Sequence, residues 1–282
     1  VKDIIMVTPP NKERKINNNI LVAAKIAGVN KIFKVGGAQA IAALAYGTET
    51  INNVSMIVGP GNSYVTEAKR QVYGDVGIDM IAGPSEVLII TDNEANPIFI
   101  AADLMAQAEH DELASSILLT DSINLADRVK EEISNQIKDR LRKDIIEKSL
   151  KKYGKIIICR DINECIEVAN LIAPEHLEIL VKEPMNYLEK IKNAGAVFLG
   201  EYSPEALGDY YAGTNHVLPT NGSARFSSQL SVDTFTKRSS YLYYSKDALL
   251  KSGEKIVKFA EKEALEAHKN SIKMRLNYEK DK

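Results

Sequence analysis

Short apolar runs alternate with amphipathic stretches along this chain of 282 residues. Alternation of this kind is typical of βα units and of a largely parallel sheet, so the pattern predicts an α/β fold. Strands are expected at residues 4–8, 32–35 and 54–58, and helices at residues 18–27, 38–46 and 62–73. Each of these helices ends beside a glycine, which is a common stop signal. Three βα units therefore fit into residues 1–75.

A second α/β series follows. Strands are expected at residues 86–91, 117–119, 155–159, 177–181 and 196–199, with a helix at residues 97–110. A charged stretch up to residue 152 carries an apolar residue at every fourth position, which predicts one long helix with a solvated charged face. These apolar residues are Leu125, Val129, Ile133, Ile137, Leu141 and Ile145. From residue 246 onward the pattern is helical without a strand.

The length favours about two domains, at roughly 100 to 200 residues each. We divide the chain into a first α/β domain at residues 1–84, a second at residues 85–235 and a helical tail at residues 236–282. A tail without a strand either packs on its own body or reaches a partner subunit.

Charge and composition exclude several classes of function. The 36 Lys and Arg residues against 38 Asp and Glu residues give a net charge of −2, which argues against nucleic acid as the main partner. No apolar run approaches the roughly 20 residues that span a bilayer, so no membrane helix is expected. The two cysteines, Cys159 and Cys165, do not form a disulfide framework or a zinc motif, which favours a reducing, cytoplasmic setting.

The first group with metal-binding chemistry is Gln107 and His110, three residues apart near the end of a predicted helix. Residues at this spacing share a helix face, so one cation could touch both. Asp209 and His268 are the further donors available, and such a set would suit zinc with positions left for substrate. Spacing does not prove that the four converge, and a plain solvated helix is the alternative.

The second group is Glu175 and His176, adjacent residues that follow Pro174 and precede a predicted strand. Active-site residues of α/β proteins often lie at such a strand edge. A carboxylic acid beside an imidazole offers two proton-transfer groups with different working pKa values. The alternative is a turn whose polar residues face water.

Glycine turns form the third group. Residues 59–62 (GPGN) join a predicted strand to a helix, where backbone N–H groups could receive a phosphate. Neither this turn nor residues 36–40 (GGAQA) completes the dinucleotide fingerprint GxGxxG. A tight βα turn is the alternative for both, and also for residues 83–86 (GPSE), whose reactive group is Ser85.

Together these motifs closely resemble those of the histidinol dehydrogenase family, over nearly the whole chain. The segments that carry the resemblance are VGGAQAIAALAYGT at residues 35–48, IVGPGN at 57–62, YVTEAK at 64–69, GIDMIAGPSE at 77–86, QAEHD at 107–111, APEHLE at 173–178, PEALGDY at 204–210 and ARFSS at 224–228. The resemblance implies two incomplete Rossmann-like parallel-sheet domains, of which residues 1–84 bind NAD and residues 85–235 carry the zinc and catalytic residues.

The resemblance also implies an activity: oxidation of L-histidinol to L-histidine, the last step of histidine biosynthesis, in two NAD-dependent steps through histidinaldehyde. His176 is then the base of the alcohol step, and Glu175 activates the water that adds to the aldehyde. The implied zinc ligands are Gln107, His110, Asp209 and His268, which with Ser85, His176 and Glu263 also form the substrate site. Gln39 and Asn62 match the positions that contact NAD, and His216 lies nearby with no assigned role.

Members of that family carry a substantial segment ahead of the position of Val1, which completes one α/β domain and part of the NAD surface. We therefore expect this to be an N-terminally truncated chain, whose second domain is incomplete without that segment. The tail from about Lys246 is expected to cross to a second subunit, so that a homodimer shares its active sites. The alternatives are a related dehydrogenase for another small alcohol and a non-catalytic fragment that serves in binding or assembly.

Overall fold

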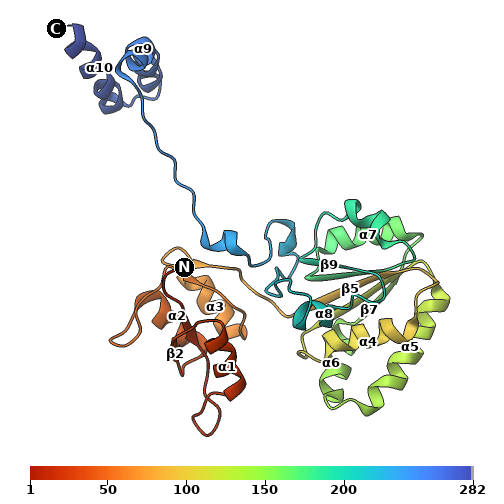
Figure 1. Ribbon diagram of the computed structural model, residues 1–282. Coiled ribbons are helices and arrows are strands. Elements are labelled where there is room, and N and C mark those ends of the chain that lie inside the picture. Colours follow the sequence, from red (N-terminus) through yellow and green to blue (C-terminus); the bar gives the residue numbers. More distant parts are fainter. Residues whose placement is uncertain (281–282) are drawn as a thin grey trace. The chain divides into compact units, whose positions relative to one another are not determined.

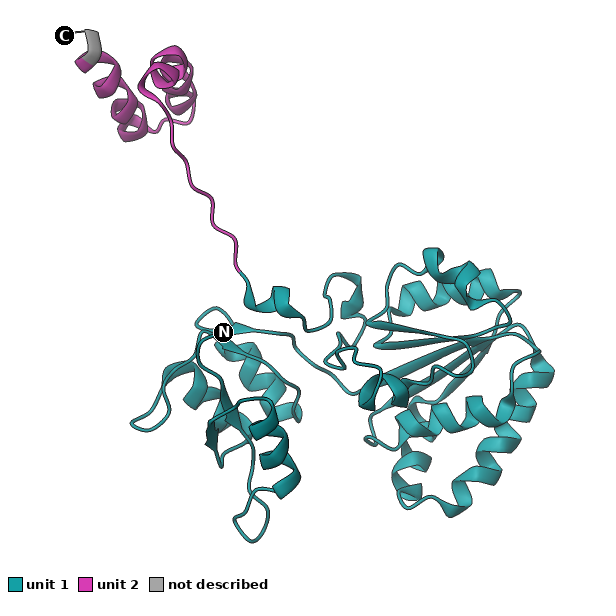
Figure 2. Cartoon of the chain, in the orientation of Figure 1, with its two compact units in different colours: residues 1–236 teal, residues 237–282 magenta. Residues whose placement is uncertain are grey.

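A computed structural model describes residues 1–280. The chain forms two compact units, Val1–Thr236 and Lys237–Lys282 (Figure 2). All strand pairs that the structure describes are parallel, and helices alternate with strands through the first unit. The α/β class expected from the pattern is therefore confirmed.

The N-terminal region of the first unit contains two short parallel sheets. One pairs β1 (Ile5–Val7) with β2 (Lys31–Phe33), and the other pairs β3 (Met56–Ile57) with β4 (Gly77–Ile78). The helices are α1 (Asn18–Ile26), α2 (Gly37–Tyr46) and α3 (Ser63–Val72). The three βα units are as predicted, whereas β4 was not expected, because two residues are too few for a hydrophobic period to appear.

The second region of this unit contains a five-stranded sheet in the order β7-β6-β5-β8-β9. Its strands are β5 (Glu86–Thr91), β6 (Ser115–Thr120), β7 (Lys155–Ile158), β8 (His176–Leu180) and β9 (Ala196–Leu199). The central strand β5 is buried at every position after Glu86. A parallel strand covered on both faces has this continuous apolar character.

Helices cover both faces of this sheet (Figure 1). α4 (Pro97–Ala108), α5 (Ile123–Gln136) and α6 (Lys143–Tyr153) lie on one side, and α7 (Ile162–Ile172) lies on the other. Alternate residues of β5 serve the two faces: Ile89 packs with the α4 and α5 side, and Leu88 packs with the α7 side. This alternation fixes the register of the strand, because a slip of one residue would exchange the faces.

The charged stretch after β6 is not the single helix that we predicted. It forms α5 and α6, separated by the 3-10 turn η1 (Ile137–Asp139). Residues four apart on a helix advance by more than one turn, so a period-four stripe drifts by about 40° at each repeat and leaves the packed face. Leu125 and Val129 are buried in the core, whereas Leu141 lies fully exposed between the two helices.

The second unit is helical, as the pattern predicted. α9 (Lys246–Lys262) and α10 (Glu266–Lys280) pack together, with Leu276 against Gly253. The turn between them places Ala264 at φ +57°, in the left-handed region that often ends a helix. Residues 237–245, which precede α9, contain no helix or strand. None of the helices described within residues 18–280 combines the length and the apolar character needed to cross a membrane.

Candidate functional site

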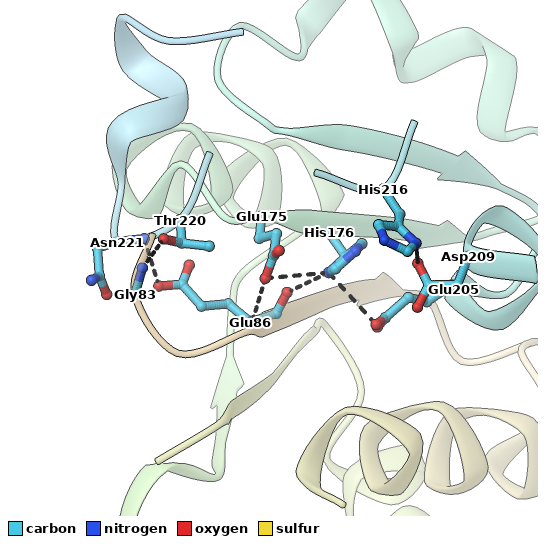
Figure 3. Close-up of polar contacts among 9 residues, drawn as sticks. All are labelled: Gly83, Glu86, Glu175, His176, Glu205, Asp209, His216, Thr220 and Asn221. Atoms are coloured by element: carbon cyan, nitrogen blue, oxygen red, sulfur yellow. Dashed lines mark hydrogen bonds and ion pairs between the residues drawn. The ribbon is translucent and has the colours of Figure 1, made fainter. Parts of the chain in front are cut away.

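Polar side chains gather at the amino ends of β5 and β8 in the five-stranded sheet (Figure 3). His176 is the first residue of β8, Glu86 is the first of β5, and Glu175 directly precedes β8. Open parallel sheets usually bind ligands at the carboxyl ends of their strands. This cluster lies instead at the amino-terminal edge of the sheet, where the loops that precede the strands bring buried acids together.

The His176 ring has one satisfied and one free nitrogen. Nδ1 lies 3.0 Å from the backbone oxygen of Glu86, and since that oxygen only accepts, Nδ1 carries the proton. Nε2 is buried and has no hydrogen-bond partner among the described residues. Burial lowers the pKa of His176, so the ring is neutral near pH 7. The ring thus holds a free lone pair on Nε2, as a base requires.

Glu175 is buried beside this ring, with Oε2 at 3.7 Å from His176 Nδ1. Its carboxylate accepts the Glu86 N–H at 2.9 Å and hydrogen-bonds the Ser85 side chain. Burial, reinforced by the nearby Glu86 and Asp209 charges, raises the pKa of Glu175 to about 8. A group that titrates so close to neutrality exchanges protons readily within the working range of an enzyme.

Glu205 is a site residue that the sequence analysis did not assign. It begins α8 (Glu205–Tyr210), it is buried, and its Oε1 lies 3.7 Å from His176 Nδ1. Burial and the charges of Asp209 and Glu178 raise the pKa of Glu205 to about 9. The signal in the sequence was the spacing of Glu205 and Asp209, four residues apart and so on one helix face.

Three side chains at this site are close enough together to bind one metal ion. Among the residues that the structure describes, His110, Glu205 and Asp209 bring potential ligand atoms within 4.8 Å of one another. Gln107 adjoins them and is fully buried; with its amide turned so that the nitrogen rather than the oxygen faces the acceptors of Glu205, that nitrogen donates to both carboxylate oxygens at 2.7 Å. Its oxygen is then left available as a ligand, so these residues offer an imidazole, carboxylates and a neutral amide, a set that suits zinc.

The structure therefore brings together Gln107, His110 and Asp209 of the four predicted ligands. His216 adjoins them, with Nδ1 at 4.0 Å from Asp209 Oδ1 (Figure 3). The remaining predicted residues of this site, Glu263 and His268, belong to the second unit, where Glu263 is the C-cap of α9 and His268 lies in the first turn of α10.

Gln39 and Asn62 lie in the N-terminal region, each in or next to the first turn of a helix. Asn62 caps α3, and its Oδ1 accepts the Val65 N–H at 3.1 Å. Gln39 lies in the first turn of α2 and folds back over Gly37. Both follow glycine turns at the carboxyl ends of strands, where unpaired helix N–H groups favour negative charge.

Comparison with known proteins agrees with the motifs. The family model described as histidinol dehydrogenase matches residues 1–276. The histidinol dehydrogenase of Clostridium acetobutylicum is 62% identical over 275 residues, which cover 98% of this chain and 64% of that protein. The one from Prochlorococcus marinus is 56% identical over 275 residues, which cover 98% of this chain and 62% of that protein. The chain thus spans less than two thirds of the length of these relatives.

Solved structures give the same result. The crystal structure of histidinol dehydrogenase from Elizabethkingia anophelis matches with a TM-score of 0.91 and 45% identity, over 98% of this chain and 64% of that one. A probable aldehyde dehydrogenase from Listeria monocytogenes matches with a TM-score of 0.55 and 12% identity, over 86% of this chain and 70% of that one. The second match shows only that the fold is shared.

Proposed function

Because the chain belongs to the histidinol dehydrogenase family, we propose that it oxidises L-histidinol to L-histidine through histidinaldehyde, with two molecules of NAD as oxidant. The observation that carries this proposal is the buried, unpartnered Nε2 of His176 beside the group formed by His110, Glu205 and Asp209. A neutral base beside a candidate cation site suits the removal of a proton from an alcohol.

The metal-ligating residues of the first unit fit zinc. Gln107, His110 and Asp209 would hold the ion, with His268 as the fourth ligand. Bound zinc would supply positive charge that orients the nitrogen atoms of the substrate. Glu205 holds the Gln107 amide through its nitrogen and so leaves the amide oxygen for the metal.

In the alcohol step, His176 Nε2 accepts the proton of the substrate hydroxyl while the carbon-bound hydrogen leaves as hydride. The hydrogen bond from Nδ1 to the Glu86 oxygen fixes the tautomer and steadies the imidazolium that forms. The products of this step are the aldehyde, one NADH and one proton held on His176.

In the aldehyde step, Glu175 accepts a proton from the water that adds to the carbonyl carbon. The hydrate, formed as its anion, then gives up hydride to NAD, which yields the carboxylic acid and a second NADH, and the acid releases its remaining proton to solvent to become the carboxylate. Since the pKa of Glu175 is about 8, the carboxylate form that this role needs gains population as the pH rises toward that value. Ser85 and the Glu86 N–H orient the carboxylate through its hydrogen bonds.

The helical unit is the proposed source of Glu263 and His268 for the active site of a second copy. Support comes from its compactness and from residues 237–245, an irregular stretch that could span about 30 Å when extended. Mixing two inactive variants, His176→Ala and His268→Ala, tests this homodimer. If the helical unit of one copy completes the active site of the other, hybrid dimers contain one intact site and regain activity. No recovery would show that each copy completes its own site.

The activity itself is tested by following NADH at saturating L-histidinol with the zinc-loaded protein. We expect two NADH per L-histidinol consumed, and none after the metal is removed by a chelator. Turnover of other small alcohols without turnover of L-histidinol would point to a related dehydrogenase. A protein that binds neither NAD nor zinc would be a non-catalytic member of the family.

A further inference from the structure

A buried ion pair lies behind the glycine turn that connects β3 to α3. Lys69 Nζ pairs with Asp79 Oδ1, and the two side chains are only 2% and 1% exposed. Both partners also bind Gly59: Nζ donates to its oxygen at 3.1 Å, and its N–H donates to Asp79 Oδ2 at 2.7 Å. One ion pair thus holds both backbone polar groups of a single residue.

Stability alone does not account for this arrangement. Replacing a buried ion pair with apolar residues of similar volume is often neutral or stabilising, because desolvation offsets the attraction of the charges. What apolar residues cannot do is bind the backbone groups of Gly59. The benefit of the pair is therefore the fixed position of the turn.

The turn needs this support because its conformation is unusual. Gly59 has φ +109°, in the region that favours glycine, although a Cβ there would meet no atom within 4 Å. The glycine is required by the backbone rather than by lack of space. Without outside anchors such a residue samples many conformations, since glycine is the most flexible of the residues.

The turn leads directly into the first turn of α3, which carries Asn62 as its N-cap. Fixing Gly59 therefore fixes where the N–H groups of α3 and the Asn62 amide lie relative to β3. A second contact continues the support: Thr66 Oγ1 donates to the Ala82 oxygen at 3.0 Å, in the segment that runs from Asp79 toward Ser85. The pair and this contact join the turn to the chain leading to the active site.

We propose that Lys69 and Asp79 are positioning residues for NAD: they hold the turn at residues 59–62 in the conformation that receives the cofactor. The proposal rests on the proposed function, since it takes this turn as part of the NAD surface. The pair itself does not touch the cofactor. It acts through the Gly59 backbone, so its loss should weaken NAD binding and leave the zinc and L-histidinol contacts unchanged.

The test is the double variant Lys69→Met/Asp79→Leu, which leaves no buried charge unpaired. We expect its KM for NAD to rise about tenfold or more, since a displacement of about 1 Å costs up to ~100-fold in positioning. The KM for L-histidinol, kcat at saturating NAD and the zinc content should stay within about twofold of wild type. A purely structural role would instead lower the melting temperature and leave the KM for NAD in the folded fraction unchanged.

The matched control is Asp127→Leu/Lys130→Met, which removes an exposed ion pair on α5 and should change none of these quantities. If the buried double variant does not fold, Lys69→Gln/Asp79→Asn is used, because the two amides keep much of the shape and leave no buried charge unpaired. It should raise the KM for NAD by a smaller factor. A folded variant of either kind with the wild-type KM for NAD overturns the proposal.

The wild-type protein distinguishes failure of this inference from failure of the proposed function. If it forms no NADH from L-histidinol, NAD binding is measured directly by calorimetry in wild type and variant. Weaker binding by the variant would still support the role of the pair. Absence of NAD binding in wild type would overturn this inference together with the proposed function.

Discussion

The two α/β regions of the first unit use buried charge in opposite ways. In the N-terminal region Lys69 and Asp79 neutralise each other, and their polar atoms are taken by the Gly59 and Met80 backbone. In the second region Glu175 and Glu205 are buried beside the neutral His176 ring rather than beside a fixed positive charge, and burial raises their pKa values to about 8 and about 9.

The difference indicates which role the buried charged groups have in each region. A satisfied ion pair has little capacity left for a ligand and serves to fix a shape. Crowded acids with raised pKa values retain capacity for protons and for a cation, which is typical of functional sites. The two clusters also differ in position: the ion pair lies behind a glycine turn at a carboxyl strand end, whereas Glu175 directly precedes β8 and the Glu205 carboxyl lies beside the first residue of that strand.

The largest expected effect comes from removing the proposed base of the second region, His176. His176→Asn should lower kcat for NADH formation by about 10²- to 10⁴-fold, the usual contribution of general base catalysis. The zinc content should stay at the wild-type value, because His176 is not a proposed ligand. His216→Asn is the matched histidine variant and should lose less activity, since its ring is mostly exposed. Equal losses in the two variants would contradict the role of His176.

Glu175→Gln should affect the two half-reactions unequally. The amide keeps the shape but accepts no proton, so oxidation of supplied histidinaldehyde should fall about 10²-fold and the alcohol step should fall less. In wild type the aldehyde step should rise with pH, with an inflection at or below about 8, since a bound cation lowers the pKa further. Single-turnover rates measure both steps.

The exposed Glu183→Gln serves as the control for this experiment, because Glu183 lies beyond the far end of β8. It should leave both rates and their pH dependence unchanged. Equal impairment of the two half-reactions in Glu175→Gln would show that Glu175 is not the base for water addition.

A smaller effect is expected for Glu205→Gln. Its side-chain amide loses one of the two acceptors that face the Gln107 nitrogen, so the Gln107 oxygen is held less firmly. Loss of such an outer contact typically weakens metal affinity about 10- to 100-fold. Zinc titration against a competing chelator measures this, and His110→Ala, which removes a direct ligand, should abolish stoichiometric zinc. Unchanged affinity in Glu205→Gln would contradict its part in the metal site.

The last prediction concerns stability rather than activity. The folded pKa values of Glu175 and Glu205 lie above the ordinary value of 4.5, so the native state binds more protons than the unfolded chain at intermediate pH. Stability of the metal-free protein should therefore be greatest at low pH within this window and fall from about pH 5 to about pH 9. Zinc should reduce that fall, which calorimetric melting with and without the metal would show. An identical pH dependence in both states would contradict a cation site among these acids.

Local pattern predicted most of the elements. The helices α1 to α4 and the strands β5 to β9 follow from apolar runs, periodicity and glycine stops, which act over a few residues. Prediction failed where local signals were short or misleading. β4 has two residues, and the period-four stripe through Leu141 continued past the point where α5 ends.

The sequence by itself determined the α/β class, the family motifs and the candidate residues, because residue types and short spacings are written in the chain. Only the tertiary structure decided that the site lies at the amino edge of the sheet and that Glu205 joins it. The strand order β7-β6-β5-β8-β9 brings Glu86 beside His176, 90 residues apart in the chain, and no local signal encodes that pairing. Raised pKa values likewise arise from burial, which exists only after the chain has packed.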